Sequence, residues 1–449
     1  MTASIAGGAP DGARHHPAAN LRTRVPKHEG RGPHREVPPE TTWSRVEPHL
    51  RRAGVTRLAD VTGLDRVGLP VYTAVVPRSN DTISVYAGKG PTRLSAKVSA
   101  VMEAMERFAA WLPVRPAVVA SYAELDAAGR VAVDPRSVCV ETTASYRPDG
   151  PLSWVTGWDL LAGEPVLVPQ DAAVYQRRLH EPPTYRIATT NGLASGNSIE
   201  EAVCHALCEV IERDALTLAD LVSGRLVQLA GRRGLDATAL EERHPVVGTD
   251  SLTGRAAEVV AAYERAALRV RLIEITSDLR VPTYVATTEE DLGPGTSRCH
   301  SGWGTHPDAE VAIVRALTEC AQSRAVDVQA MREDISAPGE EVSRYERHTR
   351  RAQVVRRDDW VRRTTEPVSA AARPSYPSGD VAEDIRLMLG RLRDAGLPRV
   401  VVVDLSPPEI PVSVVRVLVP GLESWAVDHS KVGARAAAVW NAGLAEVTS

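Results

Sequence analysis

The sequence of 449 residues is poor in the features that mark several classes of protein. Aromatic residues make up only 4% of the chain, with a single Phe, so a stacking surface for single-stranded nucleic acid is not expected. The 53 Lys and Arg nearly balance the 57 Asp and Glu, which leaves a net charge of −4 and no general attraction to nucleic acid or to an anionic membrane. The five cysteines are too few and too scattered for a disulfide framework; they are Cys139, Cys204, Cys208, Cys299 and Cys320.

Long apolar runs are also missing. A membrane-spanning helix takes about 20 mostly apolar residues, and no stretch approaches that length. The N-terminus lacks the apolar region of a secretory signal. We therefore expect a cytoplasmic protein with reduced thiols, no membrane span and no nucleic-acid partner.

The composition changes along the chain and suggests how it is organised. Residues 1–40 are rich in Gly, Pro, Ala, His and Arg with little apolar periodicity, and we interpret them as a disordered tail. Residues 41–334 should fold continuously. Residues 335–380 are crowded with charges and prolines, which is typical of a charged surface insertion, and residues 381–449 should form a C-terminal part.

Predicted strands alternate with predicted helices, which indicates an α/β (α+β) protein with mixed β-sheets. Runs rich in β-branched residues predict strands over 69–76, 268–276, 281–287, 399–405 and 412–418, and helical periodicity predicts a helix over 381–395.

One pattern of sixteen residues occurs three times without gaps, over 92–107, 198–213 and 308–323. The three copies share an Ala at the fifth position, a second Ala four residues later and a Glu at the twelfth position. Good helix formers fill each copy and neither Gly nor Pro interrupts it, so each copy should be a helix. Ser198 with Glu201 has the spacing of a capping box, and Thr305 with Asp308 offers a weaker one. The two alanines leave a flat strip on which another backbone can pack closely.

Two of the copies carry a pair of glutamates three residues apart, which places both carboxylates on one helix face. The pairs are Glu103 with Glu106 and Glu209 with Glu212, and an Arg follows each pair directly. Two neighbouring carboxylates repel each other and need a positive partner. That partner is either the adjacent Arg or a hard cation such as Mg²⁺, which binds one or two carboxylates together with phosphate oxygens.

A turn that contains glycine precedes each copy, and such turns fit a phosphate-binding role. Backbone N–H groups at a helix N-terminus attract phosphate. In the first turn Lys89 lies between Gly88 and Gly90, where its ammonium group can meet a phosphate, although an exposed turn explains the same residues. The spacing of a Walker A motif is absent.

These residues resemble the motifs of the YcaO family. The first motif corresponds to Ser99, Glu103, Glu106 and Arg107, the second to Asn197, Glu201, Glu209, Glu212 and Arg213, and the third to Glu319, Gln322 and Arg324. The resemblance implies a YcaO-type fold that binds ATP and Mg²⁺. Carried over residue by residue, it implies that Glu103, Glu106, Glu209 and Glu212 hold Mg²⁺, and that ATP contacts Ser99, Asn197, Glu201, Gln322 and Arg324, with Lys89 beside them.

The resemblance further implies an enzyme that activates a backbone amide of a ribosomally made precursor peptide by phosphorylating the carbonyl oxygen, and a homodimer. Residues 54–70, the Gly-Lys-Gly turn and residues 331–334 are similar to members that install a thioamide with a TfuA-like partner. The chain ends in Ala-Glu-Val-Thr-Ser rather than in the Pro-x-Pro-x-Pro tail that many azoline-forming members carry. Azoline or amidine formation, a regulatory role in methylthiolation of another protein and a non-catalytic peptide-binding scaffold remain alternatives.

Cys204 and Cys208 are four residues apart, with His205 between them. A zinc site would need more ligands on the same side, for which Cys299 and His300 are the candidates close in sequence. Packing of small cysteines against neighbouring helices is the favoured explanation of the pair.

Overall fold

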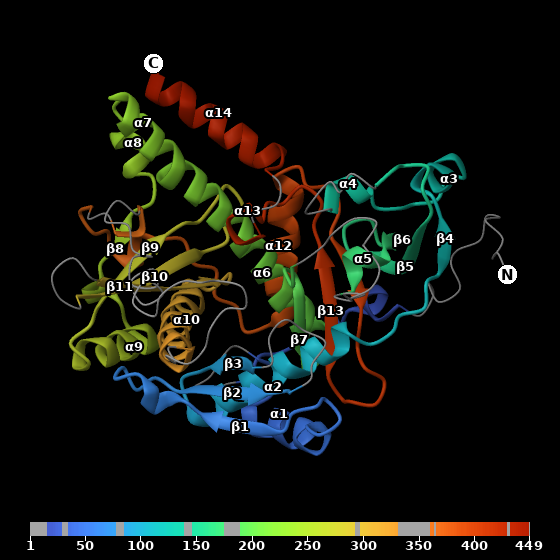
Figure 1. Cartoon of the computed structure of the whole chain (residues 1–449), viewed down its shortest axis with the longest axis horizontal. Helices are drawn as coiled ribbons and strands as arrows, with labels where there is room; N and C mark the ends of the chain where they lie inside the picture. Colours follow the sequence, from blue (N-terminus) through green and yellow to red (C-terminus); the bar gives the residue numbers. More distant parts are fainter. Residues whose placement is uncertain are drawn as a thin grey trace, which may run out of the picture.

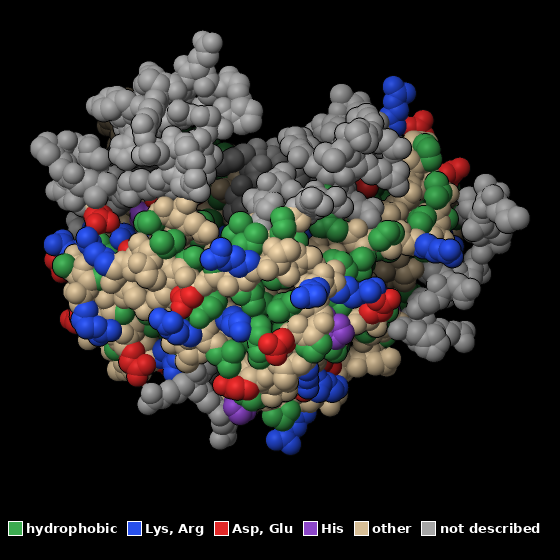
Figure 2. All heavy atoms as spheres, turned by 60° about the horizontal axis from the view of Figure 1, so that its bottom comes forward, with side chains coloured by type: hydrophobic (Ala, Val, Ile, Leu, Met, Phe, Trp, Pro, Cys, Tyr) green, Lys and Arg blue, Asp and Glu red, His purple; other side chains and the backbone are tan. Residues whose placement is uncertain are grey.

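The computed structural model describes residues 16–28, 35–77, 85–138, 146–174, 189–291, 297–330, 360–362, 365–428 and 432–448. In this part of the chain three β-sheets surround a set of central helices (Figure 1), which confirms the α/β (α+β) class. Among the described residues, no helix combines the length and the apolar character needed to cross a membrane. On the face in Figure 2, basic and acidic side chains are interspersed.

All pairs between named strands are antiparallel, and parallel pairing is confined to single bridges such as Ala132 with Leu167. The first sheet consists of β1 (Arg57–Asp60), β2 (Val71–Val75) and β3 (Val85–Lys89). The second, in the order β11-β10-β9-β8, consists of β8 (Val246–Val247), β9 (Arg269–Glu274), β10 (Thr283–Asp291) and β11 (Ser297–Thr305). The third, in the order β4-β5-β12-β13-β7 with β6 beside β5, consists of β4 (Val118–Ala120), β5 (Leu152–Asp159), β6 (Glu164–Pro169), β7 (Leu193–Gly196), β12 (Val401–Asp404) and β13 (Ser413–Leu418). The five predicted strands are β2, β9, β10, β12 and β13.

The helices fall into three long ones that carry the repeat and a set of shorter ones around them. The repeat forms α2 (Arg93–Ala110), α6 (Ile199–Ala219) and α10 (Ala309–Ala330), as predicted. The others are α1 (Pro39–Val46), α3 (Tyr122–Ala127), α4 (Pro135–Val138), α5 (Gln170–Ala173), α7 (Val227–Arg233), α8 (Thr238–Glu241), α9 (Gly254–Arg265), α12 (Val381–Asp394), α13 (Trp425–Asp428) and α14 (Ala434–Thr448). The helix predicted over 381–395 is α12.

The helix starts agree with the predicted caps only in part. The hydroxyl of Ser198 accepts the N–H of Glu201, but the Glu201 side chain turns to Asn197, so only half of that capping box forms. At α10 the carboxylate of Asp308 accepts the N–H of Glu310, whereas the Thr305 hydroxyl donates to Thr283. The expected cap by Thr305 is therefore wrong, because that hydroxyl is used inside the sheet.

The three repeated helices form a closed ring of strand–helix units. Each helix packs on the strand that precedes it, α2 on β3, α6 on β7 and α10 on β11. Each also packs on the strand of the next unit, α2 on β7, α6 on β11 and α10 on β3. Three large apolar cores follow the same division, one around each long helix. In the ring every copy forms a helix that packs on two strands in the same way, and this shared packing explains why the same pattern recurs three times.

The conserved spacing of small residues within the three copies allows strand and helix to approach closely. The alanines of the strip, Ala96 and Ala100 in the first copy, are fully buried. A Cβ added at Gly88 would lie 2.0 Å from the Ala100 nitrogen, and one added at Gly304 would lie 2.0 Å from the Ala312 oxygen. Glycine is required at both positions because the opposing atoms belong to the backbone.

We expect Gly304→Ala to lower the free energy of unfolding by about 1–3 kcal/mol or more, since the new methyl group must push α10 away from β11. Gly390→Ala is the matched control, because Gly390 lies inside α12 with nothing within 4 Å of an added Cβ. That exchange should be neutral or stabilise by about 0.5–1 kcal/mol. Urea unfolding of both variants measures the difference, and equal stabilities would contradict the close approach.

The predicted disordered tail is wrong for most of residues 16–40. Val25 is fully buried, its N–H donates to Asp380, and α1 begins at Pro39. Lys27 forms a buried ion pair with Asp384 of α12 at 2.5 Å. We call residues 16–28 and 35–42 the N-terminal segment. Several predicted segments lie outside the described residues. They are 1–15 and 29–34 of the tail, 331–334, and 335–359 and 363–364 of the predicted insertion.

Candidate active site

The glutamates of the three copies face one another in the middle of the ring. Glu106 of α2 lies close enough to Glu103 and Glu209 for both carboxylates to act on it electrostatically. The carboxylates of Glu209 and of Glu319 on α10 act electrostatically on Glu212 of α6 in the same way. The structure therefore brings together the four carboxylates singled out in the sequence and adds a fifth, that of Glu319. We call these five residues the carboxylate cluster.

The second glutamate of each pair is the buried one, with an exposed fraction of 5% for Glu106 and 3% for Glu212. Burial raises the pKa of Glu106 well above 4.5, and the charges of Glu103 and Glu209 add to the rise. Burial likewise raises the pKa of Glu212 to about 7, despite the opposing charge of Arg213. The pKa of Glu209 is raised by burial and by Glu103. Negative charge in the cluster is thus only partly compensated by the protein itself.

Positive side chains nevertheless reach the first glutamate of each copy. Arg107 donates to Glu103 at 2.8 Å, and Arg213 lies 3.7 Å from Glu209. Lys89 at the end of β3 pairs with Glu319, so that a salt bridge links the first and third units. This ion pair and Arg213 hold the pKa of Glu319 below its ordinary value in spite of burial. Arg213 also lies 3.6 Å from Oε1 of the buried Glu212, so the adjacent Arg residues account for part of the pattern.

The buried oxygen Oε2 of Glu212 has no hydrogen-bond partner among the described residues. An unsatisfied carboxylate oxygen inside a protein is costly, and a bound cation is one of its standard explanations. All five residues of the carboxylate cluster are in the described part of the chain. Among these described residues, no three carboxylates bring ligand atoms within 4.8 Å of one another. One ion can therefore contact at most two of these carboxylates in this arrangement, and phosphate oxygens and water normally complete the coordination of Mg²⁺.

The raised pKa of Glu212 predicts how stability depends on pH in metal-free protein. A carboxyl group that titrates near 4.5 when unfolded and near 7 when folded stabilises the fold below pH 4.5, and this contribution is lost as the pH rises through 7. We expect the unfolding free energy of the wild type to fall relative to that of Glu212→Gln over this interval. Urea unfolding with a chelator, repeated from pH 4.5 to 8, measures the difference, and parallel curves would contradict the assignment.

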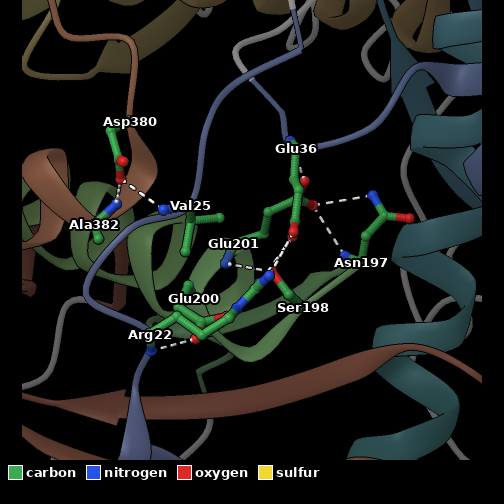
Figure 3. A network of polar contacts seen from close by, with 9 residues as sticks. All are labelled: Arg22, Val25, Glu36, Asn197, Ser198, Glu200, Glu201, Asp380 and Ala382. Carbon is green, nitrogen blue, oxygen red and sulfur yellow. Dashed lines mark hydrogen bonds and ion pairs between the residues drawn. The ribbon is translucent and has the colours of Figure 1, made fainter.

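Asn197 and Glu201, at the start of α6, meet the N-terminal segment (Figure 3). Glu201 accepts hydrogen bonds from the backbone and side-chain nitrogens of Asn197 at 2.9 and 3.0 Å, and from the N–H of Glu36 at 2.6 Å. The Asn197 side-chain oxygen accepts from Thr42. Two residues predicted to contact ATP are therefore part of a polar network that holds residues 36–42 beside the ring.

A second set of contacts anchors the same segment. Arg22 donates to Glu200 and to Glu36, so it ties the start of α6 to both halves of the N-terminal segment (Figure 3). These bonds and the pair of Lys27 with Asp384 fix residues 16–28 between α6 and α12.

Three other predicted residues lie on the repeated helices without joining this network. Ser99 is half-buried on α2, and Gln322 is half-buried on α10, one turn after Glu319. Arg324 is buried and pairs with Asp65 through two bonds of 2.9 Å and with Glu290 at 3.1 Å. Its Nη1 has no hydrogen-bond partner among the described residues. Most of this guanidinium group is therefore bound to two carboxylates, and the sequence did not predict that either of them pairs with Arg324.

Four residues near the cluster were missed in the sequence. Arg315 of α10 acts electrostatically on Glu212 and on His205, and its Nε is buried with no hydrogen-bond partner in the described part of the chain. His205 shares the inward face of α6 with Glu201 and Glu209, and an Arg35 nitrogen lies 3.4 Å from its Nδ1. Burial, with Arg315, Arg35 and Lys89 nearby, lowers the pKa of His205 well below 6.5. The fourth missed residue is Arg416 of β13, a buried guanidinium beside Glu209. The helical spacing could have indicated His205 and Arg315, whereas Arg35 and Arg416 come from distant segments.

The cysteine pair is part of a different buried group. Cys204, His306 and Asp384 have ligand atoms within 4.8 Å of one another, whereas His205 points to Arg35. The His306 Nδ1 accepts the N–H of Asp308, so Nε2 carries the proton and faces Asp384 at 3.3 Å. The ammonium group of Lys27 already forms an ion pair with the same Asp384 carboxylate. A metal at this place would have to displace a proton and an ammonium group, so the group is a hydrogen-bonded anchor. The pKa of the Cys204 thiol is raised, which leaves it unreactive.

Comparison with known proteins adds a family match to this geometry. Residues 87–423 match the family model described as YcaO cyclodehydratase, ATP- and Mg²⁺-binding. An uncharacterized protein of Methanothermobacter thermautotrophicus is 34% identical over 89% of this chain and 97% of its own length. A protein of Rhizobium leguminosarum bv. trifolii, described by its position in the tfuA 3′ region, is 32% identical over 87% of this chain and 88% of its own length.

Solved structures agree with these matches. The structure of YcaO from Methanopyrus kandleri bound with AMPPCP and Mg²⁺ has a TM-score of 0.66 and 28% identity, over 92% of this chain and 98% of its own length. A heterocyclase in complex with substrate and cofactor has a TM-score of 0.71 and 22% identity over 90% of this chain. The chain spans about half of that heterocyclase, 54% of its length, and the likeness concerns the fold.

Proposed function

The chain belongs to the YcaO family, and from that premise we propose that it uses ATP and Mg²⁺ to activate a backbone amide of a ribosomally made precursor peptide. The observation that carries the proposal is the carboxylate cluster, with the buried and unpartnered oxygen of Glu212 at its centre. We further propose that the protein works in the cytoplasm as a homodimer, and that residues 41–334 and 381–449 together form the catalytic unit.

Mg²⁺ would be held by Glu103, Glu106, Glu209 and Glu212. The donor set fits this ion, because all four ligands are carboxylates and Mg²⁺ prefers oxygen. The raised pKa values of Glu106, Glu209 and Glu212 fit as well, since a cation adds positive charge beside these buried carboxylates. Arg107 and Arg213 would orient the outer carboxylates of the two pairs.

ATP would lie along α6, with its nucleoside near Asn197 and Glu201. A carboxylate repels phosphate but accepts hydrogen bonds from sugar hydroxyl groups, so Glu201 suits that end of the nucleotide. Lys89 would face the phosphates. Ser99, Gln322 and Arg324 complete the proposed contacts, and Arg324 would use Nη1, which its two carboxylate partners leave available.

When bound, ATP supplies the phosphoryl group that turns the amide oxygen into a leaving group, and Mg²⁺ neutralises the charge of the phosphates. The chain's own contribution is to position the reactants and to exclude water. The rigid contact between strands and helices fixes the carboxylates, and positioning of this kind accounts for much of an enzyme's rate.

For the product we favour a thioamide, formed with a TfuA-like partner that delivers sulfide. The relative in the tfuA 3′ region, similar over 87% of this chain, supports this choice. Formation of an azoline or an amidine remains the second candidate, supported by the cyclodehydratase description of the family. A non-catalytic scaffold would have no use for a buried carboxylate such as that of Glu212, whose Oε2 has no hydrogen-bond partner among the described residues.

The test is to produce the chain with a TfuA-like protein and precursor peptides encoded beside it, and to weigh the peptides by mass spectrometry. Exchange of one oxygen for one sulfur is the expected result, and it should require the partner, ATP and Mg²⁺. Loss of one water would establish the azoline alternative instead. Unmodified peptides in the presence of every component would overturn the proposal of peptide modification for those substrates.

A further inference from the structure

A cavity of about 230 Å³ is lined in part by Val210, the residue after Glu209 of the carboxylate cluster. It lies between the residues that precede β7, the end of β13 and residues 419–424 and 433–434, and its lining includes Asn191, Val210, Arg416, Leu418 and Leu422. Val210 follows Glu209 on α6, and Arg416 acts electrostatically on that carboxylate. Arg416 therefore links the lining of the cavity to one of the carboxylates proposed to hold the metal.

The position of the cavity along α6 fits a second reactant. The N-terminal segment contacts α6 at Glu200, Glu201 and His205, at the beginning of the helix. The cavity meets the same helix at Val210, and the segment that forms one of its walls is bound to the helix further on, where the Glu423 N–H donates to Asp214 and the Ala426 N–H donates to Thr217. A nucleotide that begins near Glu201 reaches Glu209 after about 12 Å of helix, so its terminal phosphate would end next to the cavity.

The lining has the chemistry that recognises a peptide backbone. Its walls combine apolar side chains such as Val210 and Leu418 with polar ones such as Thr189, Asn191 and Arg416. The side-chain oxygen Oδ1 of Asn191 is buried without a hydrogen-bond partner among the described residues, so it is an acceptor that lacks a donor. Arg416, held by a bond of 2.9 Å to the carbonyl of Thr189, brings nitrogen donors to the same cavity. A peptide unit, with one N–H and one C=O, matches this pair.

The walls formed by residues 419–424 and 433–434 are held by hydrogen bonds and an ion pair, so the cavity has a defined shape. The Glu423 N–H donates to Asp214 at 3.1 Å, and the Glu423 carboxylate accepts from Gly433 at 2.8 Å. Arg435 pairs with Asp214 at 2.9 Å. The volume admits a short stretch of extended chain with small side chains and excludes a folded partner.

We propose that this cavity binds the backbone amide that is modified, with Asn191 accepting an amide N–H and Arg416 next to the carbonyl. The proposal rests on the proposed function and names the site of its second substrate. Nothing bulky should be tolerated at the modified position, because Val210 and Leu418 close the cavity around it.

The test uses N-acetyl-glycyl-glycine N-methylamide as a minimal peptide probe and measures its saturable binding by saturation-transfer NMR, with Mg²⁺ and AMPPCP present. Ala434→Trp places a large side chain at the mouth of the cavity from an exposed position at the start of α14. Ala438→Trp, exposed on the same helix and not part of the lining, is the matched control. Asn191→Leu removes the proposed acceptor.

We expect Ala434→Trp and Asn191→Leu to weaken probe binding at least tenfold, while Ala438→Trp leaves it unchanged and all three variants bind AMPPCP with Mg²⁺ as the wild type does. Absent probe binding in the nucleotide-loaded wild type, or equal binding in every variant, would overturn the cavity assignment alone. A wild type that fails to bind AMPPCP with Mg²⁺ would overturn the proposed function and this inference with it.

Discussion

Glu212→Gln is expected to reduce Mg²⁺-dependent ATP turnover by about 100-fold or more while the protein keeps its fold. Glutamine has the shape of glutamate without its charge, so the exchange removes one ligand of the proposed Mg²⁺ site and little else. The same exchange should leave the unfolding free energy of metal-free protein at pH 8 unchanged or higher. The reason is that the wild type buries a carboxylate with a pKa of about 7, and the Oε2 atom of this carboxylate has no hydrogen-bond partner among the described residues.

Loss of turnover and gain of stability together distinguish a functional carboxylate from a structural one. Glu258→Gln is the matched control, since Glu258 is exposed on α9, far from the repeated helices in sequence. Phosphate release with and without Mg²⁺, combined with thermal unfolding in a chelator, measures both quantities. Normal turnover in Glu212→Gln would contradict the role of this residue, and a large loss of stability would show that the carboxylate holds the fold together.

Lys27→Met is expected to lower the unfolding free energy by about 3–5 kcal/mol, the cost of leaving a buried carboxylate without its partner. Only 5% of the Lys27 side chain and 1% of the Asp384 side chain are exposed. The variant should also weaken nucleotide binding, because Lys27 anchors the segment that continues to the contact of Glu36 with Glu201. Urea unfolding and a nucleotide titration measure the two effects.

Two controls separate the buried pair from ion pairs in general. Adding Asp384→Asn to Lys27→Met removes both charges and should restore much of the lost stability. Arg52→Met breaks the pair of Arg52 with Glu409, in which both side chains are more than half exposed, and should cost less than about 1 kcal/mol. If Lys27→Met were no more destabilising than Arg52→Met, the N-terminal segment would not be held by this pair.

The repeat made much of the site predictable from the sequence. A pattern of sixteen residues without gaps fixes the helical phase, so the faces of α2 and α6 that carry the paired glutamates follow directly. The alanine strip likewise predicted close packing, which the glycines of β3 and β11 confirm. What the pattern left undecided is how the three copies meet, since that depends on which strand each helix shares with its neighbour.

Contacts between distant segments account for what was missed. Composition alone indicated disorder for residues 1–40, yet the buried side chains of Ala18 and Val25, the hydrogen bonds of Arg22 and the ion pair of Lys27 hold residues 16–28 in place. Lys27 finds its partner Asp384 more than 350 residues along the chain, and no local pattern reveals that pairing. Arg324 was assigned to ATP by its motif, but Asp65 and Glu290, which bind it, lie in unrelated parts of the sequence.

The central claim is that the carboxylate cluster holds Mg²⁺ for a bound nucleotide. It is tested most directly by calorimetric titration of AMPPCP into the purified protein near pH 7, with and without Mg²⁺, in buffers of different ionisation enthalpy. The account predicts binding that requires Mg²⁺ and releases protons, because Glu212, with its pKa of about 7, must lose its proton to bind the ion. Binding that is the same without Mg²⁺, or no binding in its presence, would contradict the claim.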